Sequence, residues 1–240
     1  MNIKIATIFI IISAILLFSC SKQTIPDSDV DLGKEYFPLK VGHFVEYAVD
    51  SIKYNDFTKK IDTFSYELRD EITSEFNDDE GRVSYWVSQY KRKNQNEEWQ
   101  NNMTYYITPT PFNLEIVENN IRFVKLVFPV KTNTKWNGNV YVATQTLELS
   151  WYYNWEYSYS NINEPYSTGY VDFPYTVTVN EANDYAGDST NNLYSTRTFS
   201  RERYAKNVGM ISREIVNWVY QENIKFRKGF ILVYRAKNYN

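Results

Sequence analysis

The segment VDFPYTVTVN, residues 171–180, alternates apolar and polar positions along its whole length. Its odd-numbered positions carry Val, Phe, Tyr, Val and Val, and its even-numbered positions carry Asp, Pro, Thr, Thr and Asn. Successive side chains of a β-strand point to opposite faces of the sheet, so this alternation predicts a strand with one buried and one solvated face. Such strands are typical of antiparallel sheets.

The same period of two recurs along most of the chain from residue 37 onward. It predicts further strands in the segments 43–49, 64–68, 83–87, 114–118, 121–128, 194–204, 210–220 and 230–236. Polar turns separate them, such as NDDEG at 77–81 and the pair Asn119-Asn120, which tolerates the positive φ of a two-residue hairpin loop. No segment combines a sustained 3.6-residue period with helix caps. About ten strands in this order predict an all-β fold with little helix, in which an antiparallel meander forms a curled sheet, a half-barrel or a lipocalin-like barrel.

The N-terminal segment predicts export and lipid attachment. Lys4 precedes an apolar run over residues 5–18, which fits the core of a secretory signal and is shorter than the roughly 20 residues of a membrane-spanning helix. Leu17, Ser19 and Cys20 then resemble the lipobox at which bacterial lipoproteins are cleaved and acylated. We therefore predict a cleaved lipoprotein signal peptide over 1–19, a lipidated Cys20 with a flexible tether over 20–35, and a single β-domain over 36–240.

Composition narrows the function classes further. The chain contains 22 Tyr, 14 Phe and 6 Trp but only 8 Gly, and aromatic side chains favour strands. Cys20 is the only cysteine, which excludes a disulfide framework, a zinc ribbon and a thiol nucleophile. The formal net charge is −3, and no stripe of lysine and arginine indicates a nucleic-acid partner. We predict no metal and no cofactor, and the expected partner is the membrane, through the lipid anchor.

Five aromatic residues at every second position form the sharpest local pattern, which we call the aromatic stripe. They are Trp151, Tyr153, Trp155, Tyr157 and Tyr159. In a single strand all five rings would project from one face of the sheet. Such a row could stack on a glycan, line the cavity of an apolar ligand, form a protein interface, or belong to a core built from aromatic side chains. The sequence leaves these interpretations open.

Residue types suited to catalysis are sparse. His43 is the only histidine, and its position at the start of a strand, in phase with Val45, indicates a packed or rim residue rather than a catalytic one. A glycosidase needs two carboxylates, for which Glu156 and Asp172 are candidates, but both are expected to face solvent. The motifs GxGxxG, GxxxxGK[ST], HExxH and GxSxG are missing from the sequence. A non-enzymatic role is therefore the favoured interpretation.

Two segments resemble signatures of a widespread group of uncharacterised bacterial lipoproteins. The first is FPLKVG at 37–42, followed by Tyr47, and the second is YAKNVGMISRE at 204–214. The first motif of that group usually reads FPLxxGxxWxY, and this chain departs from it with Val45 at the tryptophan position. The resemblance implies one domain across nearly the whole mature chain and assigns no catalytic residue. Because Ser21, not Asp, follows the lipidated cysteine, it also implies attachment to the outer membrane, facing either the periplasm or the exterior.

These features predict a lipid-anchored envelope protein with a non-enzymatic binding or structural role. Two alternatives stay open. One is a carrier of a lipid or other apolar ligand in a β-barrel cavity, and the other is a surface lipoprotein that binds glycans. In both, the aromatic stripe would supply the ligand contacts.

Overall fold

The structure, a computed structural model, describes residues 31–188 and 194–240. Residues Leu32–Asn240 form one compact unit that consists almost entirely of antiparallel strands. The strands are β1 (Phe44–Asn55), β2 (Lys60–Asn77), β3 (Val83–Arg92), β4 (Gln100–Pro109), β5 (Asn113–Glu118), β6 (Ile121–Val127), β7 (Lys135–Trp136), β8 (Tyr157–Ser167), β9 (Asp172–Gly187), β10 (Ser195–Ala205), β11 (Gly209–Gln221) and β12 (Phe226–Tyr239). Two short 3-10 helices, η2 (Lys34–Tyr36) and η3 (Ser150–Tyr152), lie in the connections.

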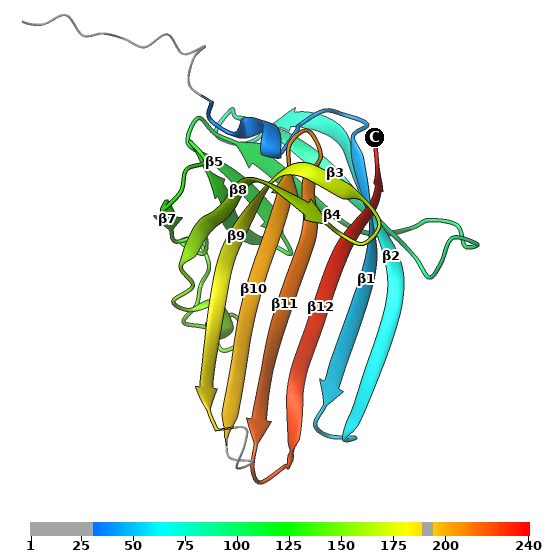
Figure 1. The fold of residues 1–240 in the computed structure, drawn as a ribbon, viewed down its shortest axis with the longest axis vertical. Helices are drawn as coiled ribbons and strands as arrows, with labels where there is room; N and C mark the ends of the chain where they lie inside the picture. Colours follow the sequence, from blue (N-terminus) through cyan, green and yellow to red (C-terminus); the bar gives the residue numbers. More distant parts are fainter. Residues whose placement is uncertain (1–30, 189–193) are drawn as a thin grey trace, which may run out of the picture. The chain divides into compact units, whose positions relative to one another are not determined.

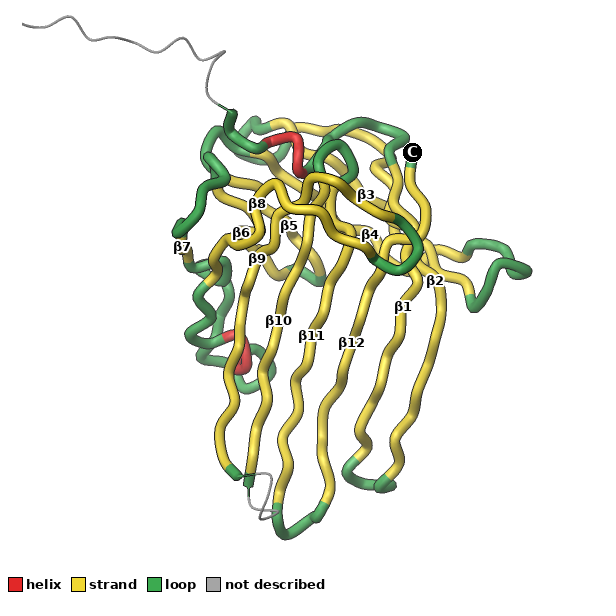
Figure 2. Tube along the Cα trace, viewed as in Figure 1, coloured by secondary structure: helices red, strands yellow, loops and turns green. Residues whose placement is uncertain are grey.

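All twelve strands belong to one sheet, in which consecutive strands pair with each other except β6 and β7. The first and last strands are also partners, because β1 pairs antiparallel with β12, for example at Val49 and Tyr234. The sheet curls into a nearly closed barrel whose two edges are β6 and β7. Strands β9 to β12, β1 and β2 continue past the other strands as an open, curved sheet (Figures 1 and 2).

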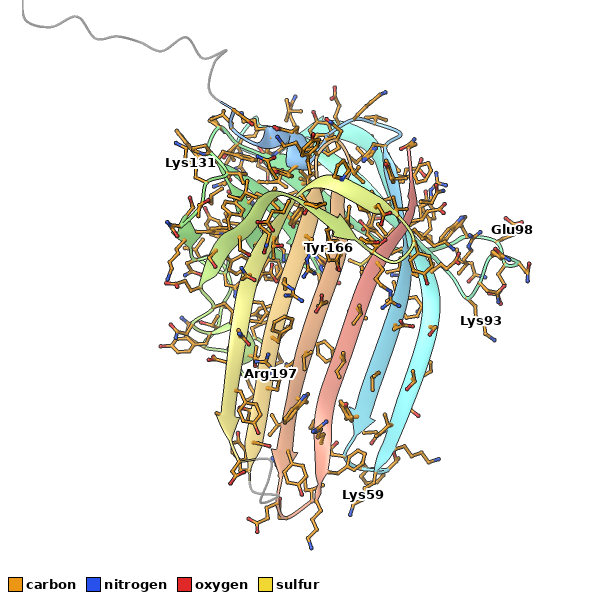
Figure 3. The ribbon with its side chains drawn as sticks, viewed as in Figure 1. Lys59, Lys93, Glu98, Lys131, Tyr166 and Arg197 are labelled. Atoms are coloured by element: carbon orange, nitrogen blue, oxygen red, sulfur yellow. The ribbon has the colours of Figure 1, made fainter. Side chains whose placement is uncertain are left out.

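The two faces of this open sheet differ in what covers them. We call the face that carries the buried side chains of Val49 and Tyr234 the inner face, because it continues the barrel interior. The opposite, outer face carries Arg197, which is labelled on β10 in Figure 3. Near the barrel, the hairpin of β8 and β9 crosses the outer face, where the guanidinium of Arg203 lies 4.2 Å from the ring centre of Tyr166 (Figure 3).

Side chains and loop atoms bridge the seam between the two edges of the barrel. The backbone N–H of Val124 on β6 donates to the carbonyl of Gly138 at 2.8 Å, and the indole of Trp136 on β7 donates to the carbonyl of Val124 at 2.8 Å. The hydroxyl of Tyr159 on β8 accepts from the N–H of Val127 at 2.8 Å and donates to its carbonyl at 2.9 Å. These bonds satisfy edge groups that would otherwise be available to another strand.

Removing the hydroxyl of Tyr159 tests this closure. The Tyr159→Phe protein leaves both backbone groups of Val127 without their partner, so we expect its free energy of unfolding to fall by about 1–3 kcal/mol in urea titrations. The matched control is Tyr153→Phe. Tyr153 is 71% exposed, so removing its hydroxyl should lower the free energy of unfolding by less than about 0.5 kcal/mol. Equal unfolding midpoints for the two variants would contradict a bridged seam.

The predicted all-β meander with little helix is confirmed. Asn119 and Asn120 have φ of 52° and 61°, which confirms the predicted two-residue hairpin between β5 and β6. The turn over 77–81 is also present, with Gly81 at φ 76°. The strand count is twelve rather than about ten, because the Asn-rich β4 and the two-residue β7 lack a clear apolar alternation.

Most of the segment 171–180 belongs to β9, but the burial of its side chains does not follow the predicted alternation. Thr176 and Thr178, expected in solvent, are buried, while Tyr175, expected in the core, is 57% exposed. Strand β8 covers the polar side, and Thr176 donates its hydroxyl to the carbonyl of Glu164 at 2.8 Å. Tyr175 turns outward because the register between β8 and β9 shifts beside it, as in a β-bulge.

The predicted tether over 20–35 is too long at its C-terminal end. Leu32 accepts a hydrogen bond from the backbone of Val130 at 3.0 Å, and the carboxylate of Glu35 lies 2.8 Å from the ammonium of Lys206. Polar composition alone did not reveal that these residues are fixed to the β-domain. The predicted signal peptide over 1–19 and the predicted lipid attachment at Cys20 lie outside the described residues.

Candidate functional site

The two motif segments at 37–42 and 204–214 lie against each other at one end of the barrel. The ring centres of Phe37 and Tyr204 are 5.9 Å apart. His43, which follows the first motif, is half-buried, and its Nε2 lies 2.9 Å from the carbonyl oxygen of Val208 in the second. The segments therefore form one junction between the N-terminal segment and the β10–β11 hairpin. The expectation that His43 is a packed or rim residue is met by this contact.

Beneath this junction the barrel contains a partly open cavity of about 50 Å³. Its polar wall consists of His43, Asp70, Gln89, Tyr105, Glu118 and Arg213. A buried water needs about 10–15 Å³ of such space, whereas small-molecule sites have about 300–1,000 Å³. The cavity therefore has room for a few waters, and none of the aromatic stripe residues lines it.

A chain of ion pairs fills the barrel interior next to this cavity. The ammonium of Lys125 on β6 lies 2.7 Å from Glu181 on β9 and 2.9 Å from Glu202 on β10. Arg213 on β11 approaches the same oxygen of Glu202 at 2.7 Å. Hydroxyls complete the coordination of the carboxylates, since Tyr204 donates to Glu202 and Ser200 donates to Glu181. The network links strands from both sides of the barrel.

The electrostatics of this network follow from its burial. Burial disfavours the charge on Glu202, but the charges of Lys125 and Arg213 outweigh it and hold the pKa of Glu202 at about 2. Glu181 has its pKa raised, by burial first and by the charge of Glu202 second. Burial also works against the ammonium of Lys125, yet the two carboxylates raise its pKa above the usual value. Glu202 is thus ionised at neutral pH, held between two cations.

Asp70 on β2 is a separate acid on the cavity wall. Its carboxylate accepts hydrogen bonds from Gln89 at 2.8 Å and from the hydroxyl of Tyr105 at 3.1 Å. Burial raises the pKa of Asp70 to about 6, and the charge of Glu118 adds to the rise. This carboxyl therefore titrates close to neutral pH without touching an open site.

The structure divides the aromatic stripe instead of presenting five rings on one face. Residues Ser150–Tyr152 form η3, and the strand begins only at Tyr157, so the expectation of one strand over the whole stripe is wrong. Asn154, at φ 61°, turns the chain between these two parts. Trp155, Tyr157 and Tyr159 are buried in the core, Trp151 is half-buried, and Tyr153 is 71% exposed.

Two stripe residues, Tyr153 and Trp155, line an open hollow of about 570 Å³ that we call the loop hollow. It is bounded by β7, the connection over 137–149 and the segment that follows η3, which is the lower red segment in Figure 2. Its rings come from Trp136, Tyr152, Tyr153 and Trp155, and its amides from Asn137, Asn139, Gln145 and Asn154. Its volume falls within the range of small-molecule sites.

Hydrogen bonds fix the wall of the loop hollow. The buried amide of Asn139 donates to the carbonyl of Tyr152 at 3.0 Å and accepts from the hydroxyl of Tyr157 at 2.9 Å. Gly138 lies directly against the ring of Tyr157, where a Cβ would come within 2.4 Å of a ring carbon. Burial raises the pKa of Tyr152 to about 12, so its hydroxyl stays protonated at neutral pH. At the rim, Lys135 and Glu156 form an exposed ion pair at 2.5 Å.

The remaining sequence candidates do not come together as a catalytic pair. Glu156 and Asp172 are both exposed, as expected, and of the residues that line the loop hollow Glu156 is the one carboxylate. Across residues 31–188 and 194–240, no three or more His, Cys, Asp or Glu side chains are grouped to hold a metal. Within the same residues no helix is long and apolar enough to cross a membrane.

Sequence reasoning missed the buried ion pairs. Lys125 lies within FVKLV at 123–127, where a lysine interrupts an otherwise apolar run, and this was the available signal. Glu202 lies between Arg201 and Arg203, and three charged residues in a row are typical of a solvated strand. Nothing in the order of these residues reveals that β6, β9 and β10 bring the charges together.

No protein-family model matches the chain, and no curated protein matches it. Among solved structures, the chain is similar to a protein with a YmcC-like fold from Bacteroides fragilis NCTC 9343. The two share 10% sequence identity over 85% of this chain and 98% of the other, with a TM-score of 0.40. This similarity is too low to carry a conclusion about function.

Proposed function

We propose that this chain is a lipid-anchored envelope protein that binds a glycan in the loop hollow. The observation that carries the proposal is the composition of the hollow: four aromatic rings and four side-chain amides around a volume of about 570 Å³. Aromatic faces pack against the apolar faces of sugar rings, and amides both donate to and accept from hydroxyl groups. A mixture of this kind suits a neutral, hydroxyl-rich ligand.

The closed part of the barrel offers less to a ligand. The cavity under the motif junction has about 50 Å³, and its neighbouring space is occupied by the ion pairs of Lys125 and Arg213. A carrier that encloses an apolar molecule inside the barrel needs several hundred Å³. The open loop hollow has that volume, so ligand capture at the surface is the better supported form of a binding role.

A binding role also fits the hollow better than hydrolysis does. Retaining and inverting glycosidases place two carboxyl groups on either side of the scissile bond. Of the described residues around the hollow, Glu156 contributes the one carboxylate, and Lys135 holds it in an ion pair. We further propose that Cys20 carries the lipid and that Ser21 directs the protein to the outer membrane, as the lipobox and the family resemblance imply.

The exposed ring of Tyr153 provides the test. Screening the protein against an array of bacterial surface oligosaccharides should identify bound sugars, whose affinities are then measured by calorimetry. Removing one stacking ring, in Tyr153→Ala, should weaken sugar binding by up to about tenfold. Adding Gln145→Ala to this variant should weaken sugar binding further. Both side chains are exposed, so neither change should alter the unfolding midpoint.

The control variant is Tyr175→Ala, which removes a ring that is 57% exposed on β9, away from the hollow. It should bind as the unmodified protein does. The proposal is wrong if no oligosaccharide binds, or if Tyr153→Ala and Tyr175→Ala bind with the same affinity as the unmodified chain.

A further inference from the structure

The inner face of the open sheet carries a second hollow region, which we call the trough. It consists of two adjoining hollows of about 620 and 730 Å³ that share Ser51 and Tyr66. Ser51 pairs with Leu232 on β12 and with Phe64 on β2, so these three side chains lie on one face. Two residues earlier on β1, Val49 carries the same face into the buried core. The trough is therefore the open continuation of the barrel interior.

The floor of the trough is apolar and lies open. Phe230 and Leu232 come from β12, and Phe64 and Tyr66 come from β2. The side chain of Phe64 is 55% exposed although it lies on the face that forms the core further along the strand. Trp151, from the aromatic stripe, stands edge-on to Phe230 with ring centres 6.1 Å apart.

Ammonium groups surround this apolar floor. Lys53, Lys91, Lys93 and Lys228 line the trough, and Lys91 lies over the ring of Tyr66 at 3.9 Å from its centre. Lys228 approaches Asp56 at 3.9 Å, and Arg92 is paired with Glu67 at 2.6 Å. Within the described part of the chain, no carboxylate lies within ion-pair distance of Lys53, Lys91 or Lys93, although the chain as a whole has a formal charge of −3. Two carboxylates also line the trough, Asp56 and Glu97, and Glu97 accepts from the backbone N–H of Lys93 at 3.3 Å. The four lysines outnumber these two carboxylates, and an excess of cations beside apolar rings favours an amphipathic anion.

We propose that the trough binds one acyl lipid whose headgroup carries a phosphate. The hydrocarbon chain lies on Phe64, Phe230 and Leu232, and the phosphate is held by Lys91 and Lys93, which line the same hollow as Phe64. Burying an acyl chain on this floor contributes roughly 25 cal/mol per Å² of apolar surface, and the lysines supply the anion contact. Each hollow has the volume of a small-molecule site. The part of β2 beneath it, residues 60–66, pairs with β1 alone, so a peptide strand added to this edge is the competing occupant that the experiment below separates from a lipid. This site is distinct from the loop hollow and does not depend on glycan binding there.

Photo-crosslinking in cells tests the proposal on the full chain. A p-benzoyl-phenylalanine at position 64 should form an adduct containing ³²P after growth in labelled phosphate, because the benzophenone would lie on the trough floor. The lipid expected on Cys20 attaches through a thioether and contains no phosphorus, so it does not contribute to this signal. The matched control is the same residue at Ile61, which is 58% exposed but lies on the outer face of the same strand.

The lysines are tested in the same assay. Combining Lys91→Gln with Lys93→Gln should lower the ³²P adduct at position 64 about fivefold per lysine. Lys59→Gln with Lys225→Gln removes the same charge from the β1–β2 and β11–β12 turns, the first of which is marked by Lys59 in Figure 3, and should leave the adduct unchanged. The proposal is overturned if position 64 gives no ³²P adduct, if it crosslinks to protein instead, if positions 61 and 64 label equally, or if both lysine pairs have the same effect.

Discussion

Replacing Lys125 by methionine is expected to lower the free energy of unfolding by about 3–5 kcal/mol. The ammonium lies between Glu181 and Glu202, and the three side chains are only 8%, 1% and 0% exposed. Without the ammonium, Glu181 has to take up a proton, and Glu202 keeps Arg213 as its remaining cationic partner. A buried carboxylate without its counterion costs far more than a lost surface contact.

The exposed pair of Lys135 and Glu156 is the natural control. Its two side chains are 62% and 64% exposed, so Lys135→Met should lower the free energy of unfolding by less than about 1 kcal/mol. Guanidinium titrations of both variants and the parent protein measure the two losses. A second variant separates lost charge balance from lost packing. Adding Glu181→Gln to Lys125→Met should recover part of the stability, because Glu202 keeps its ion pair with Arg213 and no buried carboxylate is then left without a cation among these positions. Equal losses for Lys125→Met and Lys135→Met would contradict a structural ion-pair network.

Replacing Asp70 by asparagine is expected to stabilise the protein at neutral pH but not at pH 4. Burial raises the pKa of Asp70 to about 6 from an ordinary value of 3.8, so the folded state keeps its proton over a range in which the unfolded chain has lost it. The contribution of Asp70 to stability therefore falls as pH rises from about 4 to 6. Above pH 6, the ionised Asp70 lowers the free energy of unfolding by at most about 3 kcal/mol. This follows from a pKa raised by roughly two, at 1.36 kcal/mol for each unit of pKa.

Asparagine cannot ionise, and its amide can still bond to Gln89 and to the hydroxyl oxygen of Tyr105. Urea titrations at pH 4 and pH 7.5 give the free energy of unfolding of the variant and of the parent protein. The difference between the two proteins should change between these pH values. Asp172→Asn, at an exposed position, should give the same small difference at both values. If Asp70→Asn also changes stability equally at both pH values, Asp70 does not titrate in this interval.

The strand architecture could be predicted from sequence because it depends on local patterns. Period-two alternation located most strands, and Asn119-Asn120 fixed the register between β5 and β6. The pattern failed in the β8–β9 hairpin, which folds across the outer face of the sheet and buries side chains that the alternation places in solvent. Thr176 and Thr178 follow the rule for solvated positions, yet β8 buries them, and that cover comes from outside the segment.

The candidate sites depended on contacts that local sequence does not encode. The aromatic stripe correctly drew attention to the segment 151–159, but a 3-10 helix and the turn at Asn154 send its rings to different surroundings. The loop hollow also needs Trp136 and Asn139 from an earlier connection, and the trough needs lysines from β1, β3 and β12. Each set becomes visible only once the strand order is known.

The pairing of β1 with β12 has a consequence for the order in which this chain can assemble. The strands made first and last are direct neighbours in the middle of the sheet, while the sheet edges, β6 and β7, come from the middle of the chain. During synthesis, residues 44–55 emerge long before residues 226–239, so β1 waits with one side unpaired until the last strand has been made. Contacts between residues this distant in sequence form slowly, and an exposed strand edge invites aggregation. Loss of the fourteen residues of β12 would therefore split the sheet through its centre instead of trimming its border.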